Sequence, residues 1–162
     1  MEYNKLSKQY WGPRFWTLLH TLAECSGSQN NTILASDEAE SWILLLKSQQ
    51  FVMPCPVCKK HYGDWMRTHN VDRIRQFQMS DRKKWLQIWL WELHEHVNLS
   101  NNILSDVTKE MIPEKYPRKR IDTEIRDIVD VFKLAFERHT LKPEDIHRWK
   151  TGLQRLRALY GI

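Results

Sequence analysis

Apolar side chains recur every three or four residues along most of this chain, which is the spacing of amphipathic α-helices. The pattern is strongest after Ser80 and Asp81, which can cap a helix start, and it ends near Asn98. The apolar stripe of this helix consists of Trp85, Leu86, Trp89, Leu90, Leu93 and Val97. Six further helices are expected over 11–25, from Ser36 to about Gln50, from about Pro54 to about Thr68, over 105–111, from Asp122 through Phe136, and from Pro143 through Tyr160. The sequence therefore predicts an all-α bundle.

The composition supports a compact helical protein. The chain has 162 residues, 41% of them hydrophobic, so one domain with a sizeable core is expected. Only five residues are glycine, which favours helices over a turn-rich β protein, and eight tryptophans require a large aromatic surface in a core or against a planar ligand. No window resembles a signal peptide or a membrane span, which predicts a soluble protein made in the cytosol.

The positive charge is concentrated in the last third of the chain. Residues 1–114 hold 13 Lys and Arg against 13 Asp and Glu, whereas residues 115–162 hold 12 against 7, which accounts for the net charge of +5. The stretch 116–120 is the expected junction between a domain over 1–118 and a basic helical extension over 119–162. The basic surface is either a solvated helix face or a contact with an acidic partner or nucleic acid.

Two of the three cysteines form a C-x-x-C pair, Cys55 and Cys58. Such a pair can close a small disulfide ring, and at a helix start the positive end of the helix stabilises a thiolate. The motif alone is compatible with a redox couple, half of a zinc site or two unrelated thiols. The third cysteine, Cys25, has no partner in the sequence and is expected to be a small buried hydrophobe.

A zinc site is one alternative that the histidines leave open. His61 follows Cys58 by three residues, so the two share a helix face, and His94 or His96 could complete four ligands with Cys55. The two later histidines are only two residues apart on a helix, so their side chains point in different directions. The zinc alternative corresponds to an interaction module with no oxidase activity.

Two other helical faces combine large rings with polar groups. His20 lies four residues after Trp16, and Trp91, His94, Val97 and Asn98 share one stripe of the helix that ends near residue 98. Such faces suit a flat ligand with hydrogen-bonding edges. The alternative is a core helix whose histidine is satisfied by a neighbour.

Three segments, in this order, resemble the Erv/ALR family of FAD-linked sulfhydryl oxidases. Residues 11–23 resemble its W-x3-H-x2-A opening helix, residues 54–58 resemble its redox motif, and residues 90–98 resemble its H-N-x-V-N helix. The resemblance covers about residues 10 to 116. The Trp-Gly-Pro start and the compact size look most like the versions of large DNA viruses, which implies the host cytoplasm or the virion as location.

The resemblance implies a four-helix bundle with a short fifth helix, non-covalent FAD and a homodimer. Its motifs place Cys58 against the flavin and imply no metal. The remaining implied cofactor contacts are Gly12, Trp16, His20, Trp91, His94, Val97 and Asn98, with looser matches at Asn101 and Tyr116. The sequence departs from the family at Glu95, where an Asn is usual, and at Met53, where an aromatic residue is frequent.

The resemblance also implies a reaction. A substrate dithiol would attack Cys55, and Cys58 would pass the electrons to FAD and then to O₂, giving H₂O₂. Because the sequence has no second C-x-x-C to act as a shuttle, the expected electron donor is a thioredoxin-like or small dithiol protein. The basic C-terminal helices are expected either to dock this donor or to build the dimer. A nucleic-acid-binding bundle and a thiol reductase without flavin are further alternatives.

Overall fold

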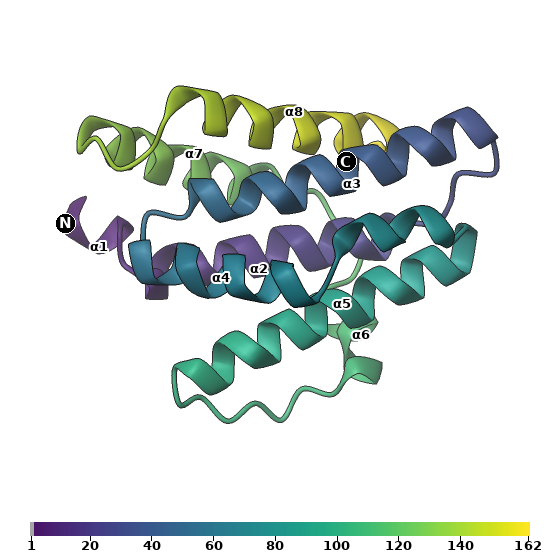
Figure 1. The fold of residues 1–162 in the computed structure, drawn as a ribbon, viewed down its shortest axis with the longest axis horizontal. Coiled ribbons are helices and arrows are strands. Elements are labelled where there is room, and N and C mark those ends of the chain that lie inside the picture. The colour runs from purple at the N-terminus through teal and green to yellow at the C-terminus, as the bar shows by residue number, and fades with distance from the viewer. Residues whose placement is uncertain (1) are drawn as a thin grey trace.

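The computed structural model describes residues 2–162, and every regular element in this range is helical (Figure 1). This confirms the predicted all-α class. The α-helices are α1 (Glu2–Lys5), α2 (Lys8–Cys25), α3 (Thr32–Val52), α4 (Pro56–Thr68), α5 (Met79–Ser100), α6 (Ile112–Lys115), α7 (Asp122–Glu137) and α8 (Pro143–Tyr160). Two 3₁₀ helices, η1 (Val71–Gln76) and η2 (Lys109–Met111), complete the set. Within residues 2–162, no helix has both the length and the hydropathy needed to cross a membrane.

The C-terminal helices share the core of the rest of the chain. Helix α8 lies along α3, and α7 packs against α2, which also contacts α5 (Figure 1). Trp149 of α8 is fully buried and donates its Nε1–H to Gln49 Oε1 at 2.8 Å. Trp42 of α3 donates in the same way to the Tyr160 hydroxyl at 2.8 Å. Two buried hydrogen bonds thus fix α8 on α3, so residues 119–162 are part of one continuous core.

The predicted starts of α3 and α5 are wrong, and α3 begins one turn earlier because a different residue caps it. Helix α3 begins at Thr32 instead of Ser36, since the Asn31 side chain accepts hydrogen bonds from the two backbone N–H groups that follow in the first turn. Helix α5 begins at Met79, so Ser80 and Asp81 lie inside the first turn and do not cap it. The expected helix over 105–111 is wrong, because only its last three residues form a 3₁₀ turn before α6.

Helix α7 does not bury every apolar side chain that recurs along it at helical spacing. Phe136 follows Phe132 by four residues, but its side chain is 49% exposed. Phe132 is buried, because its ring packs against Phe15 and Trp149 at centroid distances of 6.1 and 5.0 Å. The buried side chains of α7 are those of Ile128, Val131, Phe132 and Ala135.

A buried ion pair joins α3 to α5. Arg82 Nη1 lies 3.2 Å from Glu38 Oε1, and both side chains are at most 5% exposed. Arg82 also donates to the carbonyl oxygens of Ala35 and Phe77, and the Gly27 backbone N–H donates to the Glu38 carboxylate. Because a buried charge needs several partners to offset its lost hydration, this network holds α5 in one position relative to α3.

Two helix-interior glycines provide a matched stability test. A Cβ at Gly152 would lie 2.9 Å from the Leu45 backbone nitrogen, whereas a Cβ at Gly12 would meet nothing within 4 Å. We expect Gly152→Ala to lower the free energy of unfolding by about 1–3 kcal/mol through overpacking. Gly12→Ala should leave it unchanged or raise it by up to about 1 kcal/mol through helix propensity. Urea unfolding of both variants measures the difference, and equal effects would contradict the close approach of α8 to α3.

Candidate functional site

The C-x-x-C pair forms a disulfide at the start of α4. Cys55 is the N-cap residue, and its Sγ accepts a hydrogen bond from the Cys58 backbone N–H at 3.2 Å. The two Cα atoms are 5.2 Å apart, and both side chains are half-buried against the core. Pro56 fits the first helical position because it has no N–H that would need a partner. The disulfide therefore lies at the positive end of a helix, which stabilises a thiolate released there.

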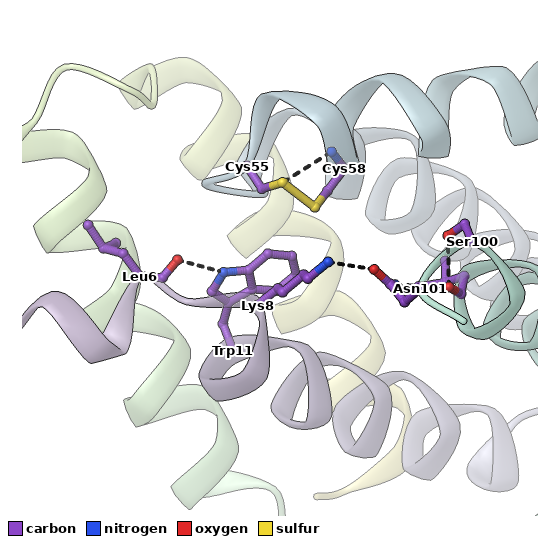
Figure 2. Close-up of a disulfide and its surroundings, with 8 residues drawn as sticks. Leu6, Lys8, Trp11, Cys55, Cys58, Ser100 and Asn101 are labelled. Atoms are coloured by element: carbon purple, nitrogen blue, oxygen red, sulfur yellow. Dashed lines mark hydrogen bonds between the residues drawn. A yellow bond between two sulfur atoms is a disulfide. The ribbon is translucent and has the colours of Figure 1, made fainter. Parts of the chain in front are cut away.

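Lys8 and Asn101 connect two helices beside the disulfide. Figure 2 shows the Lys8 ammonium donating to Asn101 Oδ1, next to Trp11, whose indole N–H donates to the Leu6 carbonyl at 3.2 Å. Asn101 also donates its Nδ2–H to the Val97 carbonyl at 2.9 Å. The bond from Lys8 joins the first turn of α2 to the residue that ends α5. The motifs gave no signal for Lys8, because its partner is 93 residues away in the sequence.

Four of the predicted cofactor contacts converge between α2, α5 and the end of α6. His20 Nε2 lies 3.3 Å from His94 Nδ1. The Trp16 ring stacks on His94 with centroids 4.0 Å apart and an interplanar angle of 11°, and Tyr116 stacks on His20 at 4.5 Å and 15°. Residues distant in sequence thus form one layered group of flat rings.

Both histidines of this group are electrically neutral at pH 7. Burial lowers the pKa of His20 to about 3, with smaller contributions from His94 and the Lys115 ammonium. Burial and then Lys115 lower the pKa of His94 to about 4. A neutral imidazole has one N–H donor and one acceptor nitrogen. Among the described residues, His20 Nδ1 is buried and has no hydrogen-bond partner.

A cleft of about 290 Å³ opens next to the ring group. Its walls include Trp91, His94, Asn98, Lys115 and Tyr116, and the Trp91 indole N–H donates to the Val107 carbonyl at 2.9 Å. Trp91, His94 and Asn98 therefore share a wall, as their spacing on one helix predicts. Lys115 was missed, because the short helix that ends with it was expected several residues earlier.

Gly12 and Val97 complete the predicted set. Gly12 lies on the same face of α2 as Trp16 and His20, with open space where a side chain would be. Val97 is half-buried and packs against the core. Open space at Gly12, an unpartnered nitrogen on His20 and the Lys115 ammonium at the cleft are compatible with a cofactor that has a flat ring, hydrogen-bonding edges and negative charge.

The fold does not bring the cysteines and histidines of the zinc alternative together. Over residues 2–162, no group of three or more His, Cys, Asp or Glu side chains is arranged to hold a metal ion. His61 is exposed, His96 lies against the Trp65 ring at 5.2 Å, and the two cysteine sulfurs are bonded to each other. Cys25 is buried and free, and burial raises the pKa of its thiol, which does not favour a reactive thiolate.

The lowered pKa of His94 predicts a pH dependence of stability. The unfolded chain takes up a proton on this ring below about pH 6.5, whereas the folded chain does so only near pH 4. The contribution of the neutral His94 ring to the free energy of unfolding is therefore complete above pH 6.5 and is lost as the pH falls. Urea unfolding measures the free energy of unfolding at about pH 7 and about pH 4.5. Between these two values it should fall by about 2–3 kcal/mol less for His94→Gln than for the wild type.

The matched control for this experiment is His147→Gln, at an exposed position of α8. It should keep the pH dependence of the wild type. Identical curves for His94→Gln and the wild type would show that His94 is not held neutral by burial.

Comparison with known proteins assigns the chain to a family. Searches of curated proteins and of solved structures found no match. A sequence model of the Erv1/Alr family matches residues 13–132, which is 120 of the 162 residues. This range includes the disulfide, both histidines and Tyr116, and it extends past the predicted junction into α7. The match and the arrangement of these residues lead to one conclusion: the chain belongs to the Erv1/Alr family, whose members are generally sulfhydryl oxidases.

Proposed function

We propose that this protein is an FAD-dependent thiol oxidase that forms disulfides in a protein partner. The observation that carries the proposal is the Cys55–Cys58 disulfide at the start of α4, bordered by the same two helices that hold the histidine pair. From Lys8 beside the disulfide to His20, helix α2 extends about 18 Å at 1.5 Å per residue. A cofactor lying along α2 and α5 would therefore reach from the ring group to the disulfide.

The cofactor would be held by the residues that line this path. Gly12 would leave room for it, the neutral rings of His20 and His94 could exchange hydrogen bonds with it, and Lys115 would offer a positive charge to its phosphates. Cys58 would be the cysteine next to the flavin. The other proposed contacts are Trp16, Trp91, Val97, Asn98, Asn101 and Tyr116. When bound, FAD accepts two electrons from a dithiol and delivers them to O₂, giving H₂O₂.

The chain's own chemistry is thiol–disulfide exchange. A substrate thiolate attacks Cys55 Sγ, a substrate–Cys55 bond forms, the Cys55–Cys58 bond breaks, and Cys58 leaves as a thiolate. The second substrate thiolate then attacks the substrate sulfur of the mixed disulfide and releases Cys55. The substrate loses two electrons and two thiol protons, and the cysteine pair gains the two electrons. The N-terminal end of α4 favours Cys58 as the leaving group because it stabilises the thiolate.

The electron donor is proposed to be a thioredoxin-like or small dithiol protein. The 162 residues contain no second C-x-x-C that could act as a shuttle, so the partner's dithiol must reach Cys55 itself. A homodimer stays a prediction, and α7 and α8 already cover faces of α2 and α3, so a dimer would use another surface. The viral origin and the location in host cytoplasm or virion also stay predictions.

Single cysteine variants test the electron path. We expect the purified protein to show flavin absorption and to consume O₂ when given dithiothreitol. Cys58→Ser should retain the flavin but lose at least about 100-fold in turnover, because the disulfide can no longer form. Cys25→Ser is the matched control and should keep turnover, since Cys25 is buried and unpaired. A colourless protein that binds no added FAD, or full turnover by Cys58→Ser, would contradict the proposal.

A further inference from the structure

The loop between α7 and α8, residues 138–142, is attached beside the disulfide. Lys59 directly follows Cys58 in the first turns of α4, and its Nζ donates to the Thr140 carbonyl of this loop at 3.1 Å. Figure 1 shows that α3 and α7 end, and α4 and α8 begin, at the same end of the molecule. The C-terminal helices thereby bring a segment more than 80 residues away in the sequence to the border of the redox pair.

Carboxylates lie next to two of the lysines at this end of the molecule. Lys60 pairs with Asp64 at 2.9 Å, and Asp145 in the first turn of α8 acts on Lys59. Among the side chains that the structure describes, residues 4–162, Lys142 has no ion-pair partner, and as the N-cap residue of α8 it makes no side-chain hydrogen bond to the helix. Burial is the main cause that lowers the pKa of Lys59; Asp145 opposes this effect and Lys142 adds to it, so the two lysines are electrostatic neighbours. The positive charge of Lys142 is therefore available to a partner.

Apolar side chains are exposed at the same end. Val57, between the two cysteines, is 62% exposed, and Phe136 in the last turn of α7 is 49% exposed. Phe51 in the last turn of α3 is 46% exposed. Val57 belongs to the ring that the disulfide closes, so its exposed side chain lies next to the redox pair. We call the surface of Val57, Lys59, Phe136 and Lys142 the docking surface.

We propose that the docking surface selects acidic protein dithiols, in which Asp or Glu residues flank the two cysteines. This inference rests on the proposed function and names its substrate class. The positive charge of Lys59 and Lys142 steers an acidic segment toward the disulfide and raises the rate of encounter. Val57 and Phe136 then bury apolar surface of the bound segment. The exchange step is unchanged: the substrate sulfur bonds to Cys55, and Cys58 leaves.

Two synthetic dithiol peptides and one small dithiol test the proposal. The peptides share a Cys-Gly-Gly-Cys centre and carry either four Glu or four Lys residues around it, and dithiothreitol reports the chemistry without docking. We expect kcat/KM for O₂ consumption to be at least about tenfold higher with the Glu peptide at low salt and to converge at high salt. A preference for the Lys peptide, or no preference, would overturn the proposal.

Charge reversal at Lys142 separates local docking from net charge. Lys142→Glu should lower kcat/KM for the Glu peptide about fivefold or more and leave dithiothreitol oxidation unchanged. The change is safe for folding, because an acidic residue at the start of α8 is favourable. Arg155→Glu, exposed on α8 and about 20 Å further along the helix, changes the net charge equally and should alter the Glu peptide's kcat/KM less than twofold.

Phe136→Ser provides a second, uncharged variant. Because Phe136 is half exposed, its loss should raise KM for both peptides and leave dithiothreitol oxidation unchanged. Equal effects of Lys142→Glu and Arg155→Glu on the Glu peptide would overturn the docking surface, since net charge alone would then explain the preference. Absence of dithiothreitol oxidation by the wild type would instead overturn the proposed function, so the two failures are distinguishable.

Discussion

Helix α8 approaches α3 so closely at Gly152 that a side chain there would collide with the backbone of Leu45. This contact lies between two buried hydrogen bonds, from Trp149 to Gln49 and from Trp42 to Tyr160, so α8 has one position along α3. The position of α7 depends on that of α8, because a short loop connects the two helices and α7 also packs on α2. The position of that loop beside the disulfide is thus a consequence of core packing far from the redox pair.

Helices α2 and α5 form the frame of the candidate site. A hydrogen bond between Lys8 and Asn101 joins them beside the disulfide, and the contact between His20 and His94 joins them further along. Burial keeps both imidazoles neutral, which makes them donors and acceptors of hydrogen bonds and not cations. In the proposed function, these two helices therefore supply the position, the shape and the hydrogen-bonding groups of the cofactor site, and the cysteine pair carries out the thiol–disulfide exchange.

Because the 162 residues contain no second C-x-x-C, the surface around Cys55 is where the protein would select its dithiol substrate. In a chain without its own shuttle, selection among dithiols can occur only where the substrate meets the disulfide. The C-terminal helices would then have two roles with one physical basis. They bury the faces of α2 and α3, and they place the loop over residues 138–142 beside the disulfide. Both roles depend on the same close packing of α8 on α3.

Periodicity and motif spacing determine much of this protein. Helix class, the C-x-x-C pair at a helix start and the shared stripe of Trp91 and His94 all follow from residues at most a few positions apart. Tertiary structure alone decided that Phe136 is exposed, that Lys8 meets Asn101, that Lys115 lies by the histidines, and that residues 138–142 border the disulfide. The reason is physical: these outcomes depend on partners from distant helices, and local periodicity carries no information about which distant surface a side chain meets.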